Sequence, residues 1–246
     1  METRVTEIAD KIYRLSTYLP QAGPGGFTFN QFFVDAEEPL LFHTGLRNIF
    51  PVVSEAIARI TPLNRLRWIT FGHFEADECG AMNQFLAAAP NATVAHGAIG
   101  VMVSVMDQAD RAPRALADGE LVDLGGKRMR RLETPHVPHG WDAGLFYEET
   151  TGTLFAGDFF SRPGDYPTMI NDSEAIYESG VAFEDALPAT ALTPQTQPTL
   201  ERLAALQPKT LALMHNSAFS GDGGALLGRL GHFYGSRFSE SIAAAV

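Results

Sequence analysis

The chain has 246 residues, 45% of them hydrophobic, with a formal net charge of −11 and a pI near 5.0, which suits one large domain with a buried core. This acidic balance repels phosphate backbones and excludes general nucleic-acid binding, and no apolar run reaches the ~18 residues that span a membrane. Because the N-terminus lacks the apolar core of an export signal and the single cysteine, Cys79, cannot form an intrachain disulfide, we expect a cytoplasmic protein.

The first half of the chain reads as strands followed by alternating helices and strands. The run FTFNQFFV is rich in aromatics and suits a buried strand, and LRWITF is a compact apolar run that ends at Gly72. The expected strands are 4–8, 11–17, 27–34, 39–42, 66–71 and 92–95. The expected helices are 47–60, 78–88 and 97–106, the first of them with one apolar face.

The second half repeats this order. Four strands are expected between 120 and 157, in the runs LVDL, KRMRRLE, GLFYEE and TLFAG, and a fifth at 210–214. The expected helices are 172–180, 198–206 and 222–244. Two similar halves of this kind indicate two sheets, each covered by helices on its outer face. The pattern therefore predicts an α/β (α+β) fold in which the sheets pack face to face as an αββα sandwich.

The segment GHFEADE at 72–78 lies directly between an expected buried strand and an expected helix. His73, Glu75 and Asp77 alternate along it, so in an extended loop their side chains share one side. Imidazole and carboxylate are good ligands for first-row divalent metals. The alternative is a solvated acidic loop in which a carboxylate, from Asp77 or Glu78, caps the following helix.

Three further segments place a histidine or an aspartate after an apolar strand. They are TPHVPHG at 134–140, with His136 and His139, LFAGDFF at 154–160, with Asp158, and LALMHNS at 211–217, with His215. Taken singly, each of these residues is more often a loop or turn residue than a ligand. Four strand ends with such residues together predict a two-metal site.

The order His-x-Glu-x-Asp, then His139, Asp158 and His215, resembles the diiron domain of flavodiiron proteins and the related oxygen-binding diiron proteins. That domain has a metallo-β-lactamase fold, and the resemblance covers the whole chain. It implies a first iron on His73, Glu75 and His139, a second iron on Asp77 and His215, and Asp158 as the bridge. His139 matches the family better than His136, because the family's third histidine precedes a short loop into a strand that ends in tyrosine, here Tyr147.

Three further residues near the expected site have roles that the family patterns do not fix: Glu78, His43 and His136. Glu78 stands where flavodiiron proteins usually have a histidine, and it could ligate the second metal, cap the helix or hydrogen-bond a ligand. His43 stands where hydrolases of the superfamily usually have an aspartate, and it either holds a ligand in place or is a core or turn histidine. His136 is expected either to contact a ligand residue from outside the metal site or to face the substrate.

The resemblance implies a non-heme diiron protein that binds, or binds and reduces, O2 or NO. Three carboxylates favour iron or manganese over zinc, although zinc or manganese could occupy the site in a given preparation. The alternative is a metal-dependent hydrolase of the metallo-β-lactamase superfamily, whose His-x-His-x-Asp-His motif would have a histidine in place of Glu75. A third possibility is an oxygen sensor without turnover.

The resemblance also bears on domains and partners. No phosphate-cradling loop of flavodoxin type is recognisable, so the sequence predicts a single domain over residues 1–246, without a flavodoxin domain and with no domain of this chain that binds FMN. Electrons for reduction would then come from a separate flavin or electron-donor protein. By analogy with flavodiiron proteins, we expect a homodimer.

Overall fold

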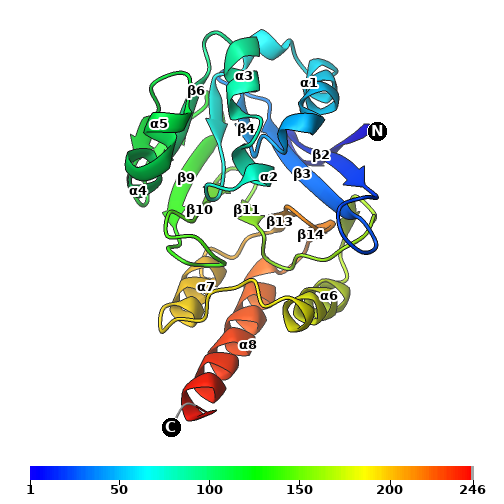
Figure 1. Ribbon diagram of the computed structural model, residues 1–246, viewed down its shortest axis with the longest axis vertical. Coiled ribbons are helices and arrows are strands. Elements are labelled where there is room, and N and C mark those ends of the chain that lie inside the picture. Colours follow the sequence, from blue (N-terminus) through cyan, green and yellow to red (C-terminus); the bar gives the residue numbers. More distant parts are fainter. Residues whose placement is uncertain (245–246) are drawn as a thin grey trace.

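The computed structural model describes residues 1–244 as two seven-stranded sheets packed face to face, with helices on both outer faces (Figure 1). The predicted αββα sandwich is therefore confirmed. Helices α1 and α3 lie on one side of the sheet pair, and α6, α7 and α8 lie on the other. In the described part of the chain, every helix is too short or too polar to cross a membrane.

The first sheet comes from the first half of the chain and follows sequence order. Its strands are β1 (Thr3–Ala9), β2 (Ile12–Leu19), β3 (Phe27–Val34), β4 (Leu40–Phe42), β5 (Trp68–Thr70), β6 (Thr93–Gly97) and β7 (Arg114–Leu116). The pairs from β1 to β4 are antiparallel, and those from β4 to β7 are parallel. The parallel pairs require crossovers, and helices α1 (Phe50–Ala58) and α3 (Met82–Ala88) lie in the first two of them.

The second sheet comes from the second half, in the order β12, β14, β13, β11, β10, β9, β8. These strands are β8 (Leu121–Asp123), β9 (Arg128–Glu133), β10 (Gly144–Glu148), β11 (Thr153–Gly157), β12 (Met169–Ile170), β13 (Thr210–Leu213) and β14 (Ala218–Ser220). The helices of this half are α6 (Ser173–Ala186), α7 (Thr196–Ala204) and α8 (Gly223–Ala244). Strands β11 and β13 are parallel neighbours, so the chain segments that follow them leave the sheet at the same edge.

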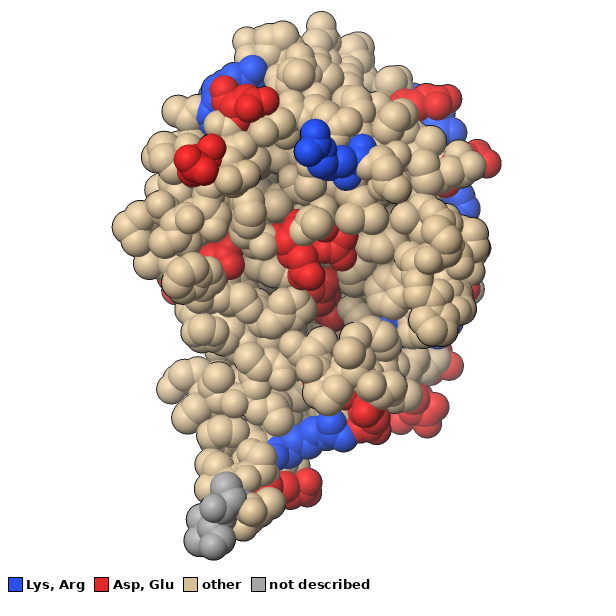
Figure 2. Space-filling model, viewed as in Figure 1, with Lys and Arg blue, Asp and Glu red and all other residues tan. Residues whose placement is uncertain are grey.

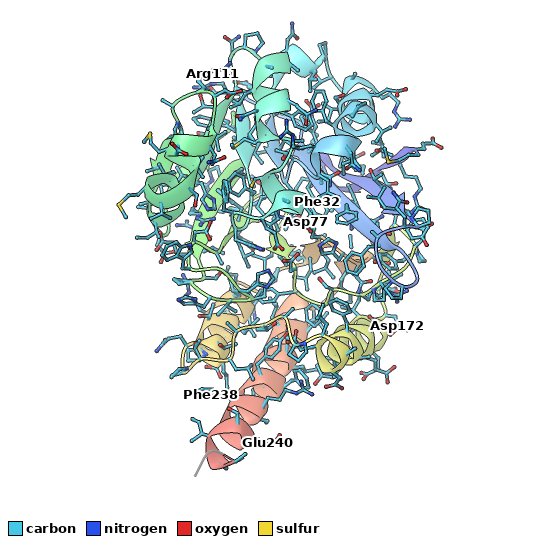
Figure 3. The ribbon with its side chains drawn as sticks, viewed as in Figure 1. Phe32, Asp77, Arg111, Asp172, Phe238 and Glu240 are labelled. Carbon is cyan, nitrogen blue, oxygen red and sulfur yellow. The ribbon has the colours of Figure 1, made fainter. Side chains whose placement is uncertain are left out.

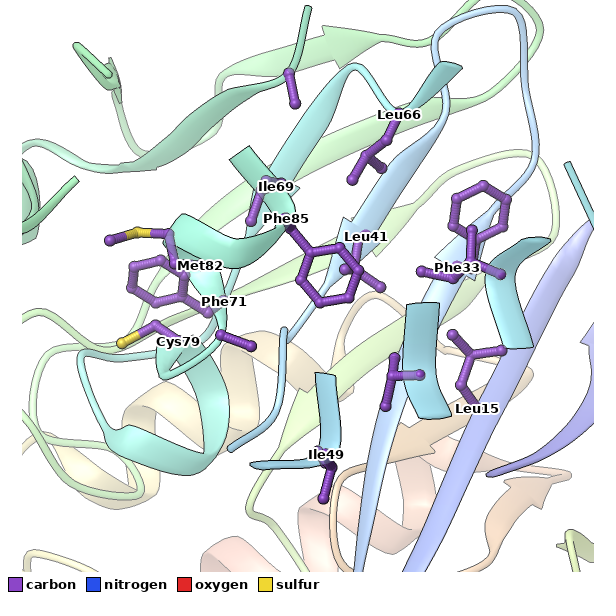
Figure 4. Packing of buried hydrophobic residues seen from close by; sticks show 14 of the residues in the cluster. Leu15, Phe33, Leu41, Ile49, Leu66, Ile69, Phe71, Cys79, Met82 and Phe85 are labelled. Atoms are coloured by element: carbon purple, nitrogen blue, oxygen red, sulfur yellow. The ribbon is translucent and has the colours of Figure 1, made fainter. Parts of the chain in front are cut away.

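Alternation along the strands separates the core into layers. Phe33 points outward and packs with Phe85 of α3 in the outer core of the first half (Figure 4). Phe32 points the other way, into the layer between the sheets, where its ring lies 5.8 Å from that of Phe155 in β11. Phe42 also contacts Phe155 across this layer, at 5.2 Å between ring centres. Because neighbouring strand residues face opposite sides, one aromatic run supplies both layers.

The structure differs from the predicted elements in a few places. The helix predicted at 78–88 is two short helices, α2 (Ala76–Cys79) and α3, which are separated at Gly80–Ala81. The helix predicted at 97–106 runs to residue 108 as α4 (Ala98–Gly100), a π-helical turn (Val101–Val105) and α5 (Met106–Gln108). Strands β7, β12 and β14 were not predicted. Each has only two or three residues, and none lies in a longer apolar or alternating run like those around β4, β5 and β8.

Candidate metal centre

The six predicted ligands lie at strand ends of both sheets and converge between the two halves. His73 and Glu75 lie in the loop after β5, and Asp77 lies in α2, which follows it. His139 lies in the β9–β10 connection, and Asp158 and His215 come directly after β11 and β13. Figure 3 shows Asp77 near the centre of the molecule, where the loops of the two sheets meet. The topology therefore brings together side chains that are up to 142 positions apart in the sequence.

Four of these side chains form the first group of donors. Each of His73, Glu75, His139 and Asp158 offers one donor atom, and these four atoms lie within 4.8 Å of one another. His73 Nε2 is 2.7 Å from Glu75 Oε2 and 3.8 Å from Asp158 Oδ2. His139 Nε2 is 3.3 Å from Glu75 Oε2 and 3.4 Å from Asp158 Oδ2. Donors held at about 2.1 Å from one ion are about 3–4 Å apart, and three of these four distances lie in that range, while the 2.7 Å between His73 and Glu75 is that of a hydrogen bond.

The other two side chains meet the opposite oxygen of the same aspartate. His215 Nε2 is 3.2 Å from Asp77 Oδ2 and 3.4 Å from Asp158 Oδ1. Asp158 therefore turns Oδ2 toward the first group and Oδ1 toward the second. Oδ1 is buried and has no hydrogen-bond partner within the described residues. An unsatisfied buried carboxylate oxygen is costly, and a cation on each side of Asp158 would remove that cost.

The charges of this cluster depend on one another. Burial alone would lower the pKa of His73, but Glu78, Glu75 and Asp158 outweigh burial and raise that pKa to about 12. Hydrogen bonds from His139 and His73 hold the pKa of Glu75 well below its usual range. Burial raises the pKa of Asp158. Metal binding at these imidazoles must therefore release protons, as is usual for histidine ligands.

Contacts outside the cluster fix which imidazole nitrogen faces it. His215 Nδ1 donates to the backbone carbonyl of Thr28 at 2.9 Å, so Nε2 is free to act as a ligand. The ring of His215 also packs against Phe27 and Phe29. His73 Nδ1 lies 3.2 Å from Glu78 Oε1, which likewise directs Nε2 into the cluster. Such outer contacts set the tautomer and orientation of metal-binding histidines.

Glu78 lies behind His73, outside the donor group. Its side chain is 1% exposed, and its Oε2 accepts the backbone N–H of His73 at 2.6 Å. Its Oε1 is 3.3 Å from Nε2 of His43. His43 is buried, has a positive φ of 65°, and its ring lies 4.1 Å from that of Phe42 at a tilt of 33°. Of the three roles that the sequence leaves open for Glu78, the structure shows a contact with His73, a predicted ligand. His43 in turn contacts Glu78.

The two histidines of the 134–140 segment lie in different places. His139 turns Nε2 toward Glu75 and Asp158, as described above. His136 is exposed and lies outside the four-residue donor group. Its backbone N–H donates to the carbonyl of Gly140, which closes the turn between them. His139 is thus the histidine of this segment that joins the donor group, and its role as a ligand stays a prediction.

The sequence does not single out His96 and Asp142, two buried residues in contact with each other. Asp142 also contacts the loop that carries His73 and Glu75. Asp142 Oδ2 accepts the backbone N–H of Phe74 at 2.9 Å and lies 3.1 Å from His96 Nε2. Phe74 stands between His73 and Glu75, and Asp142 follows His139 by three positions. Asp142 therefore joins two loops that carry predicted ligands. No motif signals this pair, because His96 and Asp142 are 46 positions apart.

We expect Asp142→Ala to weaken metal binding at the first group by about tenfold, because the loop that carries His73 and Glu75 loses its anchor to the loop of His139. Anaerobic titration with a divalent metal, followed by calorimetry, measures this. The control is Asp172→Ala, which removes the cap of α6 far from the cluster and should reduce stability without changing metal affinity. Equal affinity in both variants would show that Asp142 does not position the ligands.

A pocket of about 190 Å³ opens beside the cluster. Figure 2 shows acidic side chains gathered at the centre of this face, in a depression of the surface. Among the described residues, those that line the pocket include no lysine or arginine. The lining residues are Phe27, Glu75, Asp77, Pro138, His139, Asp158, Phe160, Ser161, Gly180, Phe183, Glu184, Leu187, Ala189, Thr190, His215, Leu230 and Tyr234.

The fold and the cluster define a metallo-β-lactamase-type domain with a group of imidazole and carboxylate donors at its centre. Residues 27–215 match the family described as ODP family beta lactamase, and the chain belongs to that family. The flavodiiron core of Flv1 from Synechocystis sp. PCC6803 superposes with a TM-score of 0.81 at 20% identity, over 95% of this chain and 60% of that one. The predicted resemblance to flavodiiron domains is thus confirmed.

Two curated relatives support the same resemblance to flavodiiron proteins. The "Putative diflavin flavoprotein A 1" of Nostoc sp. PCC 7120 is 28% identical over 197 residues, which are 77% of this chain and 33% of that protein. The anaerobic nitric oxide reductase flavorubredoxin of Pectobacterium carotovorum is 24% identical over 150 residues, 60% of this chain and 30% of that protein. The matched region thus spans about a third of the length of these relatives.

Proposed function

We propose that this chain is a non-heme diiron protein that binds and reduces O2 or NO. One observation carries the proposal: three imidazoles and three carboxylates meet, with the two oxygens of Asp158 turned toward two separate groups of donors. A single ion would need only one of these groups. The names of the relatives, a diflavin flavoprotein and a nitric oxide reductase, support the same chemistry.

In this proposal the six residues keep the roles that the resemblance implies. His73, Glu75 and His139 hold one iron, Asp77 and His215 hold the other, and Asp158 bridges. When bound, two ferrous ions supply open coordination positions and the electrons for O2 or NO. The three carboxylates nearly balance the charge of the pair and favour its oxidised form, which suits redox chemistry better than hydrolysis. The same set accepts zinc or manganese when iron is scarce.

The pocket favours this function over the hydrolase alternative. Its lining combines carboxylates with aromatic and aliphatic side chains and offers no lysine or arginine within residues 1–244. Apart from the metal ions, anionic substrates such as lactam carboxylates or phosphoesters would find no cation in this lining and would face the carboxylate of Glu184. A small neutral molecule such as O2 or NO meets no such barrier, and the apolar walls limit the entry of water.

We further propose that residues 1–246 form one domain, that the protein works in the cytoplasm, and that a flavin-containing electron donor supplies the electrons. The buried free thiol of Cys79 suits a reducing compartment.

Anaerobic loading with ferrous iron tests the proposed function. We expect about two irons per chain by metal analysis and an absorption change when O2 or NO is added, both lost in Asp158→Ala. With a reductant and a flavoprotein added, steady O2 consumption separates turnover from sensing. A protein that takes zinc in preference to iron, ignores O2 and cleaves a chromogenic ester or lactam would instead be a hydrolase.

We expect a homodimer at micromolar concentration. The helical segment 98–108 exposes four large apolar side chains, and Trp141 is exposed as well; the five are Ile99, Met102, Val103, Met106 and Trp141. Exposed apolar groups of this size are typical of surfaces that a partner covers. Light scattering measures the mass, and Met102→Glu should shift it toward the monomer if this surface is the contact. A monomeric native protein would refute the expectation.

A further inference from the structure

The pocket beside the donor cluster is much larger than a diatomic gas requires. Its volume is about 190 Å³, whereas one water molecule takes a share of about 30 Å³ in the liquid. An apolar cavity of about 150 Å³ in another protein is large enough to bind benzene. Bound metal ions would take part of this volume, and the remainder is on the order of that benzene cavity, which is room for an organic molecule with one ring.

The side of the pocket built by α6, the α6–α7 connection and α8 carries a buried carboxylate. Glu184 of α6 is 7% exposed. It accepts the backbone N–H of Thr190 at 2.9 Å, the hydroxyl of Thr190 at 3.0 Å and the hydroxyl of Tyr234 at 3.2 Å. These donors are neutral, and Glu184 forms no ion pair with any residue in the described range. A buried carboxylate without a countercharge is costly, and a cationic ligand would remove that cost.

Away from the donor cluster, the remaining walls are mainly apolar and aromatic. Phe160 and Leu230 are almost fully buried, and Phe183 lies on α6 one position before Glu184. The ring of Phe27 lies 5.9 Å from that of Phe183. Aromatic faces attract cations as well as apolar groups. Beside the donor cluster, the pocket thus offers an apolar space with the Glu184 carboxylate in its wall and no lysine or arginine in its lining among residues 1–244.

We propose that this pocket binds a small primary amine with an aromatic or aliphatic body, its ammonium group at Glu184 and its body between Phe160, Phe183 and Leu230. The site adjoins the donor cluster, so the amine would lie next to the place where O2 or NO is proposed to bind. The proposal goes beyond the proposed function and rests on the pocket alone, whichever metal the cluster holds.

Three probes with the same ring and different charge test it: benzylamine, benzyl alcohol and benzoate. Binding to the metal-loaded protein is followed by calorimetry. We expect benzylamine to bind at least tenfold more tightly than benzyl alcohol, and benzoate to show no saturable binding. Benzoate that binds as well as benzylamine, or no binding by any probe, would overturn the proposal. Neither result would affect the iron and O2 measurements, so the two proposals fail separately.

Variants locate the ammonium group. Glu184→Gln should reduce benzylamine binding at least tenfold and leave benzyl alcohol binding unchanged, whereas Glu178→Gln, on the exposed face of the same helix, should change neither. Ala189→Phe fills the pocket from a partly exposed position and should abolish binding of both probes, which keeps the test available if Glu184→Gln does not fold. Unchanged benzylamine binding in Glu184→Gln would mean that the amine binds elsewhere, for example on the metal.

Discussion

Glu78→Ala is expected to lower the free energy of unfolding by about 3–5 kcal/mol and to weaken metal binding at the first group by about 10–100-fold. The substitution leaves the backbone N–H of His73 without its acceptor. It also removes the only carboxylate oxygen in contact with both His73 Nδ1 and His43 Nε2 in the described part of the chain. Denaturation of the metal-free protein and anaerobic metal titration measure the two effects separately.

Glu148 provides the matched control for Glu78. It is also fully buried, and its oxygens accept hydrogen bonds from Thr150 and Thr151 at the end of β10, away from the donor cluster. Glu148→Ala should therefore reduce stability and leave metal affinity unchanged. If Glu78→Ala loses stability but binds metal as tightly as the native protein, Glu78 supports only the core, and its proposed hold on His73 is wrong.

Glu75→His is expected to shift the cluster toward zinc and to abolish its reaction with O2, while the fold is retained. Glu75 should bind the first metal through a carboxylate oxygen, and its negative charge favours the oxidised metal. A neutral imidazole removes that charge and restores the His-x-His-x-Asp pattern. Zinc has no accessible redox change and cannot reduce O2. The side chain of Glu75 is 51% exposed, so its replacement removes little buried surface.

Metal analysis after growth with both metals, and O2-induced absorption after ferrous loading, measure the outcome. Glu55→His, on the exposed face of α1, adds a histidine away from the cluster and should change neither quantity. Unaltered iron preference together with undiminished reaction with O2 would mean that Glu75 does not select the chemistry. The main reason for preferring the diiron protein over the hydrolase would then be lost.

The sandwich and the residues that meet at its centre could be predicted because strand and helix patterns are local and because the order of the motifs resembles that of flavodiiron domains. An apolar strand followed at once by a histidine or aspartate, as at Asp158 and His215, can be recognised without knowledge of distant contacts. The metal-binding roles of these residues stay a prediction. The short strands β7, β12 and β14 were missed because, unlike the equally short β4, β5 and β8, they do not lie in an apolar or alternating run that extends beyond the strand.

The contacts that support the predicted ligands from outside the donor cluster could not be predicted from local patterns. Asp77 and Glu78 are adjacent acidic residues at the start of α2, but successive helix positions point in different directions. Asp77 therefore reaches His215, and Glu78 turns into the core behind His73. The sequence left the role of Glu78 open for this reason. His96 and Asp142 were missed because only the folded chain brings them together.

The donors come from both sheets: His73, Glu75 and Asp77 from the first half, and His139, Asp158 and His215 from the second. Each group of donors draws on both halves. An ion bound at either group would therefore act as a cross-link between segments that are distant in the chain, and its binding energy would be gained only when the halves are docked. Metal affinity and the stability of the packing between the two sheets would then depend on the same equilibrium. A mutation in the layer between the sheets would lower metal affinity without changing any of the predicted ligands.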